Sequence, residues 1–209
     1  MRSDSVMWNI HTDLLTNNKI ELRQFGTSMT YINLCYTNKK RKEINKLCMD
    51  ELANTNTNDD YISIPMIVNN KDSNGKNQTQ YIKLFKGSPV ISRKNNNKLG
   101  VVNNEVFKVH SWNEEYVQLI GDEDEDKVLS IFIKSFQRQF LVNYCMTVFK
   151  SQGCTIDKPH TIHEWNIMSK NMKYVAISRT TKKEHINIIP SNHINNRSMV
   201  DIIAKKIQS

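Results

Sequence analysis

Two short segments in the last third of the 209-residue chain constrain its fold more than any other feature. In residues 146–153 (MTVFKSQG), a short apolar run passes directly into polar residues. This pattern predicts a strand followed by a polar turn and the start of a helix, where backbone N–H groups and hydroxyls can hold an anion. Residues 174–179 (YVAISR) form a second apolar run, which we expect to be a strand that ends at Arg179. A guanidinium at such a position suits phosphate oxygens, because it offers five donors in one plane.

The charge balance of the chain favours a polyanionic partner. The formal net charge is +8 and the isoelectric point is about 9.3. Nucleic acid is the simplest partner for such a chain. The alternative is a generally solvated surface in a proteome rich in Lys and Asn. The abundance of Asn, Ile and Lys indicates an AT-rich coding genome, viral or otherwise.

The cysteines and histidines do not indicate a metal centre. The four cysteines include no C-x-x-C pair, so we expect neither a zinc ribbon nor a redox motif, and a reducing, intracellular environment is the natural expectation. His160 and His163, with Cys154 and Glu164 nearby, could be read as a zinc cluster, but exposed histidines alternating on a strand are the better interpretation. No secretory signal is recognised and no apolar run reaches about 18 residues, so no membrane span is expected.

A strand–turn–helix unit is predicted in the first quarter of the chain. Residues 31–38 read as a buried parallel strand, and the residues that follow have Ile44 and Cys48 on one helical face. Thr37 and Asn38 fall where the strand gives way to the helix, so we expect them to cap its N-terminus, an anion-binding geometry. A helix cap with a solvated basic turn is the alternative, and the two readings are compatible. Further elements are expected over residues 1–15 (helix), 61–68 (strand), 185–190 (last sheet strand) and 199–207 (closing helix).

The middle of the chain has a different texture. Short apolar segments separated by turns recur between residues 84 and 140, which predicts a small antiparallel barrel. The acidic residues 122–126 follow an apolar run and superficially resemble a magnesium-holding Walker B segment. A solvated hairpin tip is the better interpretation, because no convergent partners for a metal are recognisable.

Together, the two constraining segments resemble motifs V and VI of superfamily 1 DNA helicases, in the branch of the RecD-like and Pif-type enzymes. The family patterns are close to T-x-H-K-S-Q-G and Y-V-A-x-S-R, and here they occur in the same order about 25 residues apart; Phe149 stands where the family usually has His. The resemblance implies an α/β fold with a RecA-like parallel sheet flanked by helices, the second motor domain, formed by residues 1–83 and 141–209. It also implies an SH3-like β-barrel inserted at residues 84–140, in which Asn104 replaces a hairpin glycine.

The resemblance also assigns roles to individual residues. Arg179 and Arg2, the latter at the position of the motif IV arginine, are the expected catalytic contacts to ATP phosphates, although Arg2 could equally be an exposed terminal arginine. The residues expected to bind nucleotide are Gln152, Gly153 and Ser178. The residues expected to bind DNA are Thr37, Asn38, Thr147, Phe149, Lys150 and Ser151, with Gln152 also on the strand-facing surface. Phe149 lacks the hydrogen-bonding group of His, while a stacking contact remains open to it.

Neither a G-x-x-x-x-G-K-[ST] phosphate loop nor a credible Walker B segment occurs in the sequence. The chain is therefore expected to be the C-terminal motor half of an ATP-dependent DNA helicase, cut out of or downstream in a larger protein. ATP and Mg²⁺ would be bound only together with the missing N-terminal helicase domain, and this chain alone would not hydrolyse ATP. The expected partners are single-stranded DNA and that N-terminal domain, at sites of DNA replication or repair. The alternative is a non-catalytic nucleic-acid-binding module with a RecA-like shell.

Overall fold

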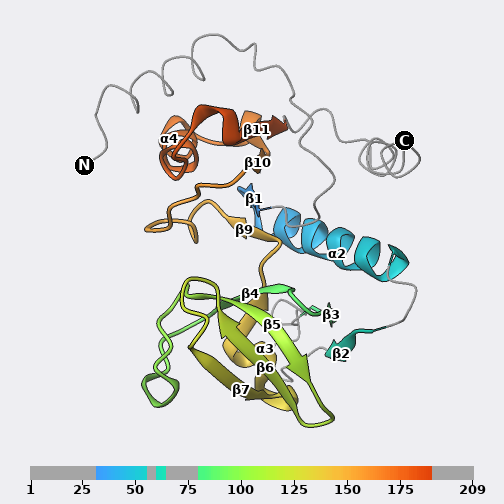
Figure 1. Ribbon diagram of the computed structural model, residues 1–209. Helices are drawn as coiled ribbons and strands as arrows, with labels where there is room; N and C mark the ends of the chain where they lie inside the picture. The colour runs from blue at the N-terminus through green and yellow to red at the C-terminus, as the bar shows by residue number, and fades with distance from the viewer. Residues whose placement is uncertain (1–31, 56–59, 65–79, 190–209) are drawn as a thin grey trace, which may run out of the picture. The chain divides into compact units, whose positions relative to one another are not determined.

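The computed structural model describes residues 32–55, 60–64 and 80–189, which fall into two compact units (Figure 1). The described part of the first unit comprises residues 32–41 and 145–189, and that of the second comprises residues 42–55, 60–64 and 80–144. The expected division at residues 83/84 and 140/141 stays a prediction. Arg2, the expected helices over 1–15 and 199–207, and the second half of the expected strand over 61–68 lie outside the described residues; the first half contains a strand, β2 (Ile62–Ile64).

The first unit is built on a parallel sheet with the strand order β11-β10-β1-β9. Its strands are β1 (Ile32–Cys35), β9 (Cys145–Thr147), β10 (His160–His163) and β11 (Ile186–Ile189). β1 lies between β10 and β9, with Leu34 opposite Ile162 on one side and Met146 on the other. In this sheet β1 pairs only with segments that follow residue 141. Residues 84–140 supply no strand to the described part of the sheet, as expected.

A helix, not a strand, contains the second constraining segment, so the expected strand at residues 174–179 is wrong. α4 (Lys170–Ser178) begins at Ser169, whose hydroxyl accepts a hydrogen bond from the Met172 N–H at 3.3 Å. Met172, Ala176 and Ile177 are buried on its inner face. The N-cap and this helical spacing override the β-branched residues Val175 and Ile177, whose strand preference depends on context.

The first constraining segment is only partly as expected. β9 ends at Thr147 and residues 148–153 form the expected polar turn, but no α-helix begins in it. Gly153 has φ of +89°, a backbone conformation that side chains with a Cβ rarely adopt. The chain then runs to an isolated parallel bridge between Ile156 and Thr180. α2 (Asn38–Thr55) follows β1 directly, as predicted.

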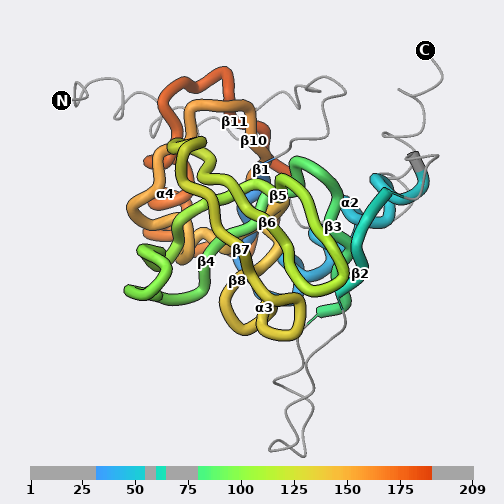
Figure 2. Tube along the Cα trace, turned by 60° about the horizontal axis from the view of Figure 1, so that its bottom comes forward, coloured from blue at the N-terminus to red at the C-terminus, as the bar shows by residue number. Residues whose placement is uncertain are grey.

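The second unit contains a five-stranded antiparallel sheet with the order β7-β6-β5-β4-β8. Its strands are β4 (Pro89–Ser92), β5 (Val106–Trp112), β6 (Tyr116–Gly121), β7 (Val128–Phe132) and β8 (Phe140–Val142). Figure 2 shows β5, β6 and β7 running side by side. The unit also contains a hairpin, β2 (Ile62–Ile64) and β3 (Ile82–Leu84), and the helices η1 (Asn97–Leu99) and α3 (Ile133–Gln139). The recurrent short strands expected between residues 84 and 140 are thus present.

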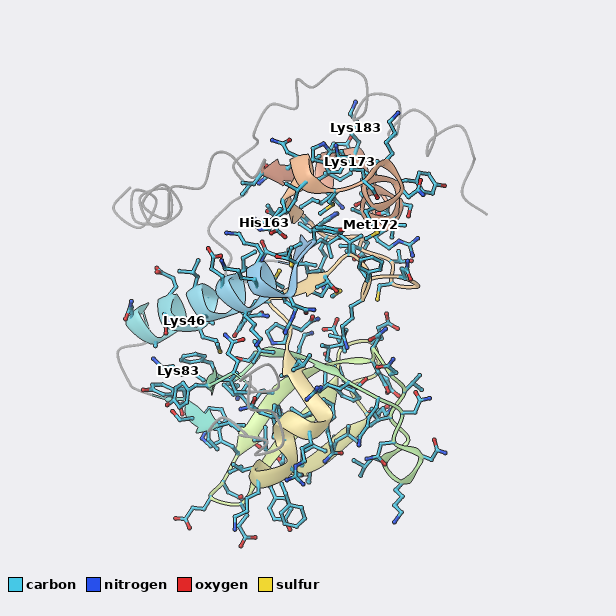
Figure 3. All side chains as sticks on the ribbon, turned by 180° about the vertical axis from the view of Figure 1, so that it is seen from behind. Lys46, Lys83, His163, Met172, Lys173 and Lys183 are labelled. Atoms are coloured by element: carbon cyan, nitrogen blue, oxygen red, sulfur yellow. The ribbon has the colours of Figure 1, made fainter. Side chains whose placement is uncertain are left out.

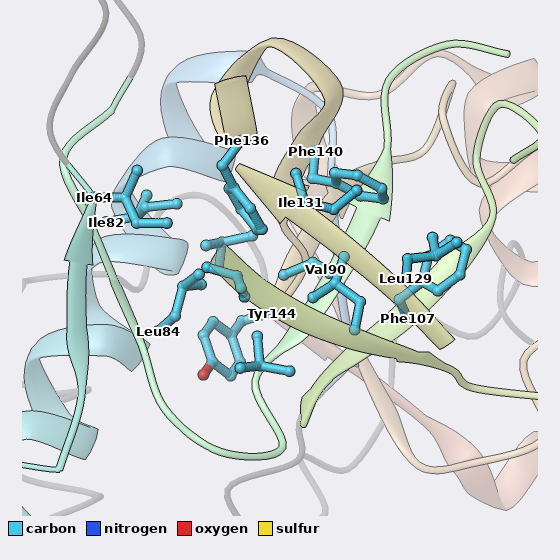
Figure 4. Packing of buried hydrophobic residues seen from close by; sticks show 14 of the residues in the cluster. Ile64, Ile82, Leu84, Val90, Phe107, Leu129, Ile131, Phe136, Phe140 and Tyr144 are labelled. Atoms are coloured by element: carbon cyan, nitrogen blue, oxygen red, sulfur yellow. The ribbon is translucent and has the colours of Figure 1, made fainter. Parts of the chain in front are cut away.

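Aromatic rings fill the core of the second unit (Figure 4). Phe140 contacts Phe107 edge-on, with ring centroids 5.7 Å apart, and lies 5.6 Å from Phe136 at a tilt of 34°. All three rings are almost completely buried. Ile64 and Ile82 from the β2–β3 hairpin belong to the same cluster. Buried aromatic rings in such arrangements contribute strongly to stability, so these contacts join the hairpin to the five-stranded sheet.

Two turns of the second unit behave as the sequence predicts. Asn104 has φ of 69°, which asparagine tolerates better than most residues. The acidic residues 122–126 connect β6 to β7, and the Lys127 N–H donates to the Asp124 carbonyl at 3.1 Å. β6 pairs on both sides with antiparallel strands, so this segment is a hairpin tip and not a Walker B strand end. No helix in the described part of the chain is both long and apolar enough to cross a membrane.

Candidate functional site

The carboxyl edge of the parallel sheet gathers most of the residues expected to bind DNA. β10, β1 and β9 are neighbours in the sheet, so the segments that follow them meet at one edge. Thr37 and Asn38 follow β1, Phe149 and Lys150 follow β9, and Glu164 follows β10. The fold therefore assembles residues that are more than 100 positions apart in the sequence.

Thr37 caps the helix that follows β1, as predicted. Its Oγ1 accepts a hydrogen bond from the Lys40 N–H at 3.2 Å, and its carbonyl accepts one from the Arg41 N–H at 3.1 Å. Asn38 is exposed, and its Oδ1 accepts from Arg41 Nε at 3.2 Å. The start of α2 is thus fixed by side-chain and backbone contacts of its own first turn.

A carboxylate from the neighbouring strand binds the same turn. Glu164 Oε2 accepts from the N–H groups of Tyr36 at 2.9 Å and Thr37 at 2.8 Å, and Oε1 accepts from Thr37 Oγ1 at 2.9 Å. Glu164 itself has φ of 59°, an uncommon backbone conformation for a residue with a side chain. Three donors that converge on one carboxylate form an anion-binding arrangement, which here is filled by a group of the protein.

This arrangement changes what Thr37 can offer to a ligand. The single hydroxyl hydrogen of Thr37 is donated to Glu164. Sequence reasoning missed this role, because it considered Glu164 only as a possible metal ligand. The available signal was an acidic residue placed directly after a strand that lies beside the Thr-Asn turn.

The turn after β9 presents an aromatic ring beside a lysine. Phe149 is 56% exposed, and its ring lies 6.4 Å from that of Tyr36 with a 31° tilt. Thr147 Oγ1 accepts from the Lys150 N–H at 3.3 Å. Ser151 is fully buried and donates its hydroxyl to the Val148 carbonyl at 2.8 Å, so in this structure it stabilises the turn.

Backbone hydrogen bonds join the chain just after the first constraining segment to the end of the second. The Ile156 N–H donates to the Arg179 carbonyl at 2.7 Å, and the Thr181 N–H donates to the Ile156 carbonyl at 3.2 Å. Gln152 and Gly153 lie exposed on the turn that leads to Ile156. The chain that leaves this turn is therefore held at the end of α4.

Arg179 ends a helix and is half-buried. Its Nε donates to the Val175 carbonyl at 3.2 Å, and its Nη2 donates to Ser178 Oγ at 2.8 Å. A cation at this position also interacts favourably with the negative end of the helix dipole. Arg179 and Ser178, assigned to different roles by the sequence, are thus direct partners.

Both histidines of β10 are buried, so the expectation of exposed histidines is wrong. β10 lies between β11 and β1, and the two histidines are each 1% exposed. His160 donates from Nδ1 to the Lys158 carbonyl at 3.1 Å and accepts at Nε2 from the Thr180 hydroxyl at 2.8 Å. Strands inside a parallel sheet are covered on both faces, so alternation along the chain does not produce an exposed side.

His163 is labelled in Figure 3 and directly precedes Glu164 in the chain. Its Nε2 donates to Asn33 Oδ1 at 2.9 Å. Burial, with a smaller contribution from the positive charge of Lys40, lowers the pKa of His163 to about 3. Burial also lowers the pKa of His160. Both rings are therefore neutral at physiological pH. In the described ranges, His, Cys, Asp and Glu side chains form no group of three or more that could hold a metal ion.

We predict that His163 makes stability depend on pH. Its pKa is about 3 in the folded protein and near 6.5 when unfolded, so the unfolded chain binds the extra proton. The contribution of neutral His163 to the free energy of unfolding is fully present above pH ~6.5 and is lost as the pH falls toward 3. When the pH is lowered from 6.5 to 5, the free energy of unfolding should fall by about 2 kcal/mol less in His163→Gln than in the parent protein, because the variant lacks this titrating group. Urea unfolding at both pH values measures this. Equal losses in the two proteins would contradict the prediction, and exposed His110→Gln is the control.

We predict that the Glu164 contact is important for stability. Glu164→Ala leaves three donors without their acceptor and should lower the free energy of unfolding by about 1–3 kcal/mol. Glu164→Gln should cost less, because its amide oxygen can still accept the backbone N–H groups. Urea denaturation provides the measurement, and exposed Glu184→Ala serves as the matched control. The same small effect for Glu164→Ala and Glu184→Ala would show that the contact is unimportant.

No protein-family model and no curated protein matches this chain. Solved structures of helicases do match it. A crystal structure of Bacteroides Pif1 bound to ssDNA is similar over 95% of this chain and 52% of its own, with a TM-score of 0.63 and 21% identity. Bacteroides Pif1 helicase in complex with ADP-AlF3 and ssDNA matches over 98% of this chain and 53% of its own, with a TM-score of 0.64 and 20% identity.

Pif1 helicase from Candida albicans is also similar, with a TM-score of 0.57 and 14% identity over 98% of this chain and 58% of its own. The present chain thus spans about half the length of these structures. At these levels of identity the likeness concerns the fold. The chain therefore has the fold of about half of a Pif1 helicase.

Proposed function

We propose that this chain is the C-terminal motor domain of a superfamily 1 DNA helicase of the Pif type. The observation that carries the proposal is the junction of the two motif-like segments: Ile156, three residues after the turn over residues 148–153, is hydrogen-bonded to Arg179 at the end of α4. In a motor, such a junction would couple the state of the nucleotide to the grip on DNA. Similarity to Pif1 structures over nearly the whole chain supports the same conclusion.

The proposed grip on single-stranded DNA uses the carboxyl edge of the parallel sheet. The exposed ring of Phe149, beside Tyr36, suits a stacking contact with a base, which is worth about 1–3 kcal/mol per base. Lys150 and Asn38 supply charge and polar groups for the phosphates, and Thr147 holds the Lys150 turn. Ser151 contributes through the shape of that turn. Thr37 contacts a phosphate only when Glu164 releases its hydroxyl.

The proposed nucleotide contacts come from the motif junction. Arg179, Ser178, Gln152 and the backbone at Gly153 offer a guanidinium, a hydroxyl, an amide and N–H groups, a donor set that fits phosphate oxygens. The ATP and Mg²⁺ would be held mainly by an N-terminal RecA-like domain, and this chain alone would not turn over ATP. An arginine contributed in trans to the γ-phosphoryl group of ATP bound there can raise the rate of phosphoryl transfer by ~10³–10⁵-fold. Arg2 is proposed as a second such arginine.

The second unit completes the proposed architecture. Its five antiparallel strands and α3 follow one another between β3 and β9 in the chain. We propose that they form an SH3-like barrel inserted into the motor domain over residues 84–140, with β8 continuing to Val142. A protein of this kind would act inside the cell at sites of DNA replication or repair.

One observation favours a second function, a nucleic-acid-binding module without ATPase activity. Arg179 is already engaged by the Val175 carbonyl and Ser178, as a residue that only stabilises a helix end would be. The two functions differ in what Arg179 does in a protein that also contains the N-terminal domain.

We predict that Lys150→Ala weakens single-strand binding by this chain. Loss of one phosphate contact should make the plot of log affinity against log salt shallower by about one unit, independently of base sequence. Fluorescence anisotropy with labelled oligothymidylate at several salt concentrations measures the slope. Lys158→Ala, an exposed lysine beyond the turn, is the control. An unchanged slope for Lys150→Ala would show that Lys150 does not contact the DNA phosphates.

We predict that Arg179→Ala nearly abolishes ATPase activity in a protein that joins this chain to its N-terminal helicase domain. Single-strand affinity should stay within a few-fold, because a catalytic arginine acts on charge that develops in the transition state. ATP turnover and DNA affinity are measured on the same preparation, with exposed Arg138→Ala as the control. Retained turnover, or a loss of DNA binding as severe as the loss of turnover, would favour the non-catalytic module.

A further inference from the structure

The outward face of the β5–β6–β7 sheet carries apolar side chains at both ends. Burial alternates along β6 and β7, with every second residue facing out. Cross-strand pairing places Tyr116 opposite Phe132 and Ile120 opposite Val128. We call the surface formed by the following residues the outer hairpin face: Tyr116, Gln118, Ile120, Val128, Ser130 and Phe132.

The two apolar pairs are accessible and well separated. The rings of Tyr116 and Phe132 lie 4.2 Å apart with a 36° tilt, yet Phe132 is 55% exposed. Val128 at the other end is also 55% exposed. Four residues of β6 at about 3.3 Å each put the two pairs ~13 Å apart, with the polar Gln118–Ser130 pair between them. Each pair is a small exposed apolar patch, and exposed apolar patches with a polar surround are typical of interaction sites.

The charge around this face is opposite to that of the whole chain. Residues 113–134 contain seven Asp or Glu and two Lys, a net charge of −5, whereas the chain carries +8. Glu114 and Glu115 lie at the hairpin end next to Tyr116, and residues 122–126 lie at the end next to Ile120. Each apolar pair is thus flanked by its own acidic cluster.

Within the described part of the chain, most of this negative charge has no ion-pair partner. Asp122 is paired with Lys108 at 2.7 Å, and Lys127 is paired with Glu105 outside the cluster. Among the described residues, none of the other carboxylates in residues 113–134 has an ion-pair partner. The acidic tip is also held in shape, because the Lys127 N–H donates to the Asp124 carbonyl and the Asp126 N–H to Asp124 Oδ1.

We propose that the outer hairpin face is a docking site for a basic, extended segment of a partner protein. Two apolar side chains of that segment, four residues apart, would pack on the Tyr116–Phe132 and Ile120–Val128 pairs. Lysines or arginines outside them would meet the two acidic clusters. Complementary charge sets specificity and the association rate, while the aromatic pair supplies most of the affinity. A nucleic acid is disfavoured here, because its phosphates would face the unneutralised carboxylates.

The test uses a fluorescein-labelled peptide with the sequence Lys-Lys-Phe-Ser-Thr-Ser-Phe-Lys-Lys, which reads the same in both directions. The full chain should bind it saturably, and Phe132→Ser should weaken binding at least tenfold. Glu123→Lys combined with Glu125→Lys should weaken it at least fivefold at low salt and much less at high salt. Tyr81→Ser, which removes another exposed ring of the second unit, should have no effect. All four substituted positions are exposed, and Val128→Ser provides a second test of the apolar contact.

Several results would overturn the proposal. Absence of saturable peptide binding, or equal weakening by Tyr81→Ser, would show that the face does not recognise this chemistry. If Phe132→Ser weakened oligothymidylate binding as much as peptide binding, the face would be part of a nucleic-acid surface. If sedimentation velocity showed a dimer that Phe132→Ser dissociates, the occupant would be a second copy of this chain. None of these measurements depends on ATPase activity.

Discussion

The candidate site depends on one carboxylate. Glu164 joins the end of β10 to the turn between β1 and α2 through three hydrogen bonds, two from backbone N–H groups and one from the Thr37 hydroxyl. Because these donors sit at the start of a long helix, they would otherwise attract an anion from solvent. The protein supplies that anion itself, through a side chain of the neighbouring strand. Any ligand phosphate that approaches this edge has to compete with Glu164 or bind beside it.

The two histidines of β10 are buried because of the position of the same strand that leads to Glu164. β10 is an inner strand, so its side chains lie in a low-dielectric environment where a charged imidazole is costly. His163 stays neutral and donates to Asn33, and His160 is held between the Lys158 carbonyl and the Thr180 hydroxyl. Thr180 follows Arg179 directly, so the His160 contact also anchors the chain just beyond α4. Buried polar contacts of β10 thus stabilise both the sheet interior and the chain next to the motif junction.

The sequence predicted features that depend on a local pattern, and it did not predict features that depend on where a segment lies in the fold. The parallel strand before α2, the Thr37 cap and the short antiparallel strands were predictable, because hydrophobic runs and turn residues carry their own signal. Residues 174–179 were not, because the capping residue Ser169 lies outside the segment and Val175 and Ile177 favour a strand only in isolation. The burial of His160 and His163 depends on the neighbours of β10, and the role of Glu164 depends on a turn more than 120 residues away. Such long-range contacts have no period that a sequence pattern can reveal.

The distribution of charge argues for two surfaces with different partners. A net charge of +8 suggests a uniformly basic protein, but a third of its 21 acidic residues lie within residues 113–134 of the second unit. A chain that only bound nucleic acid would gain affinity from replacing these carboxylates, since each one opposes phosphate binding. Their concentration beside exposed aromatic and aliphatic side chains is instead what a cationic protein segment would require. The basic character of the chain as a whole therefore fits the polyanion that it is proposed to bind, whereas the acidic hairpin fits the cationic protein segment proposed to bind the second unit.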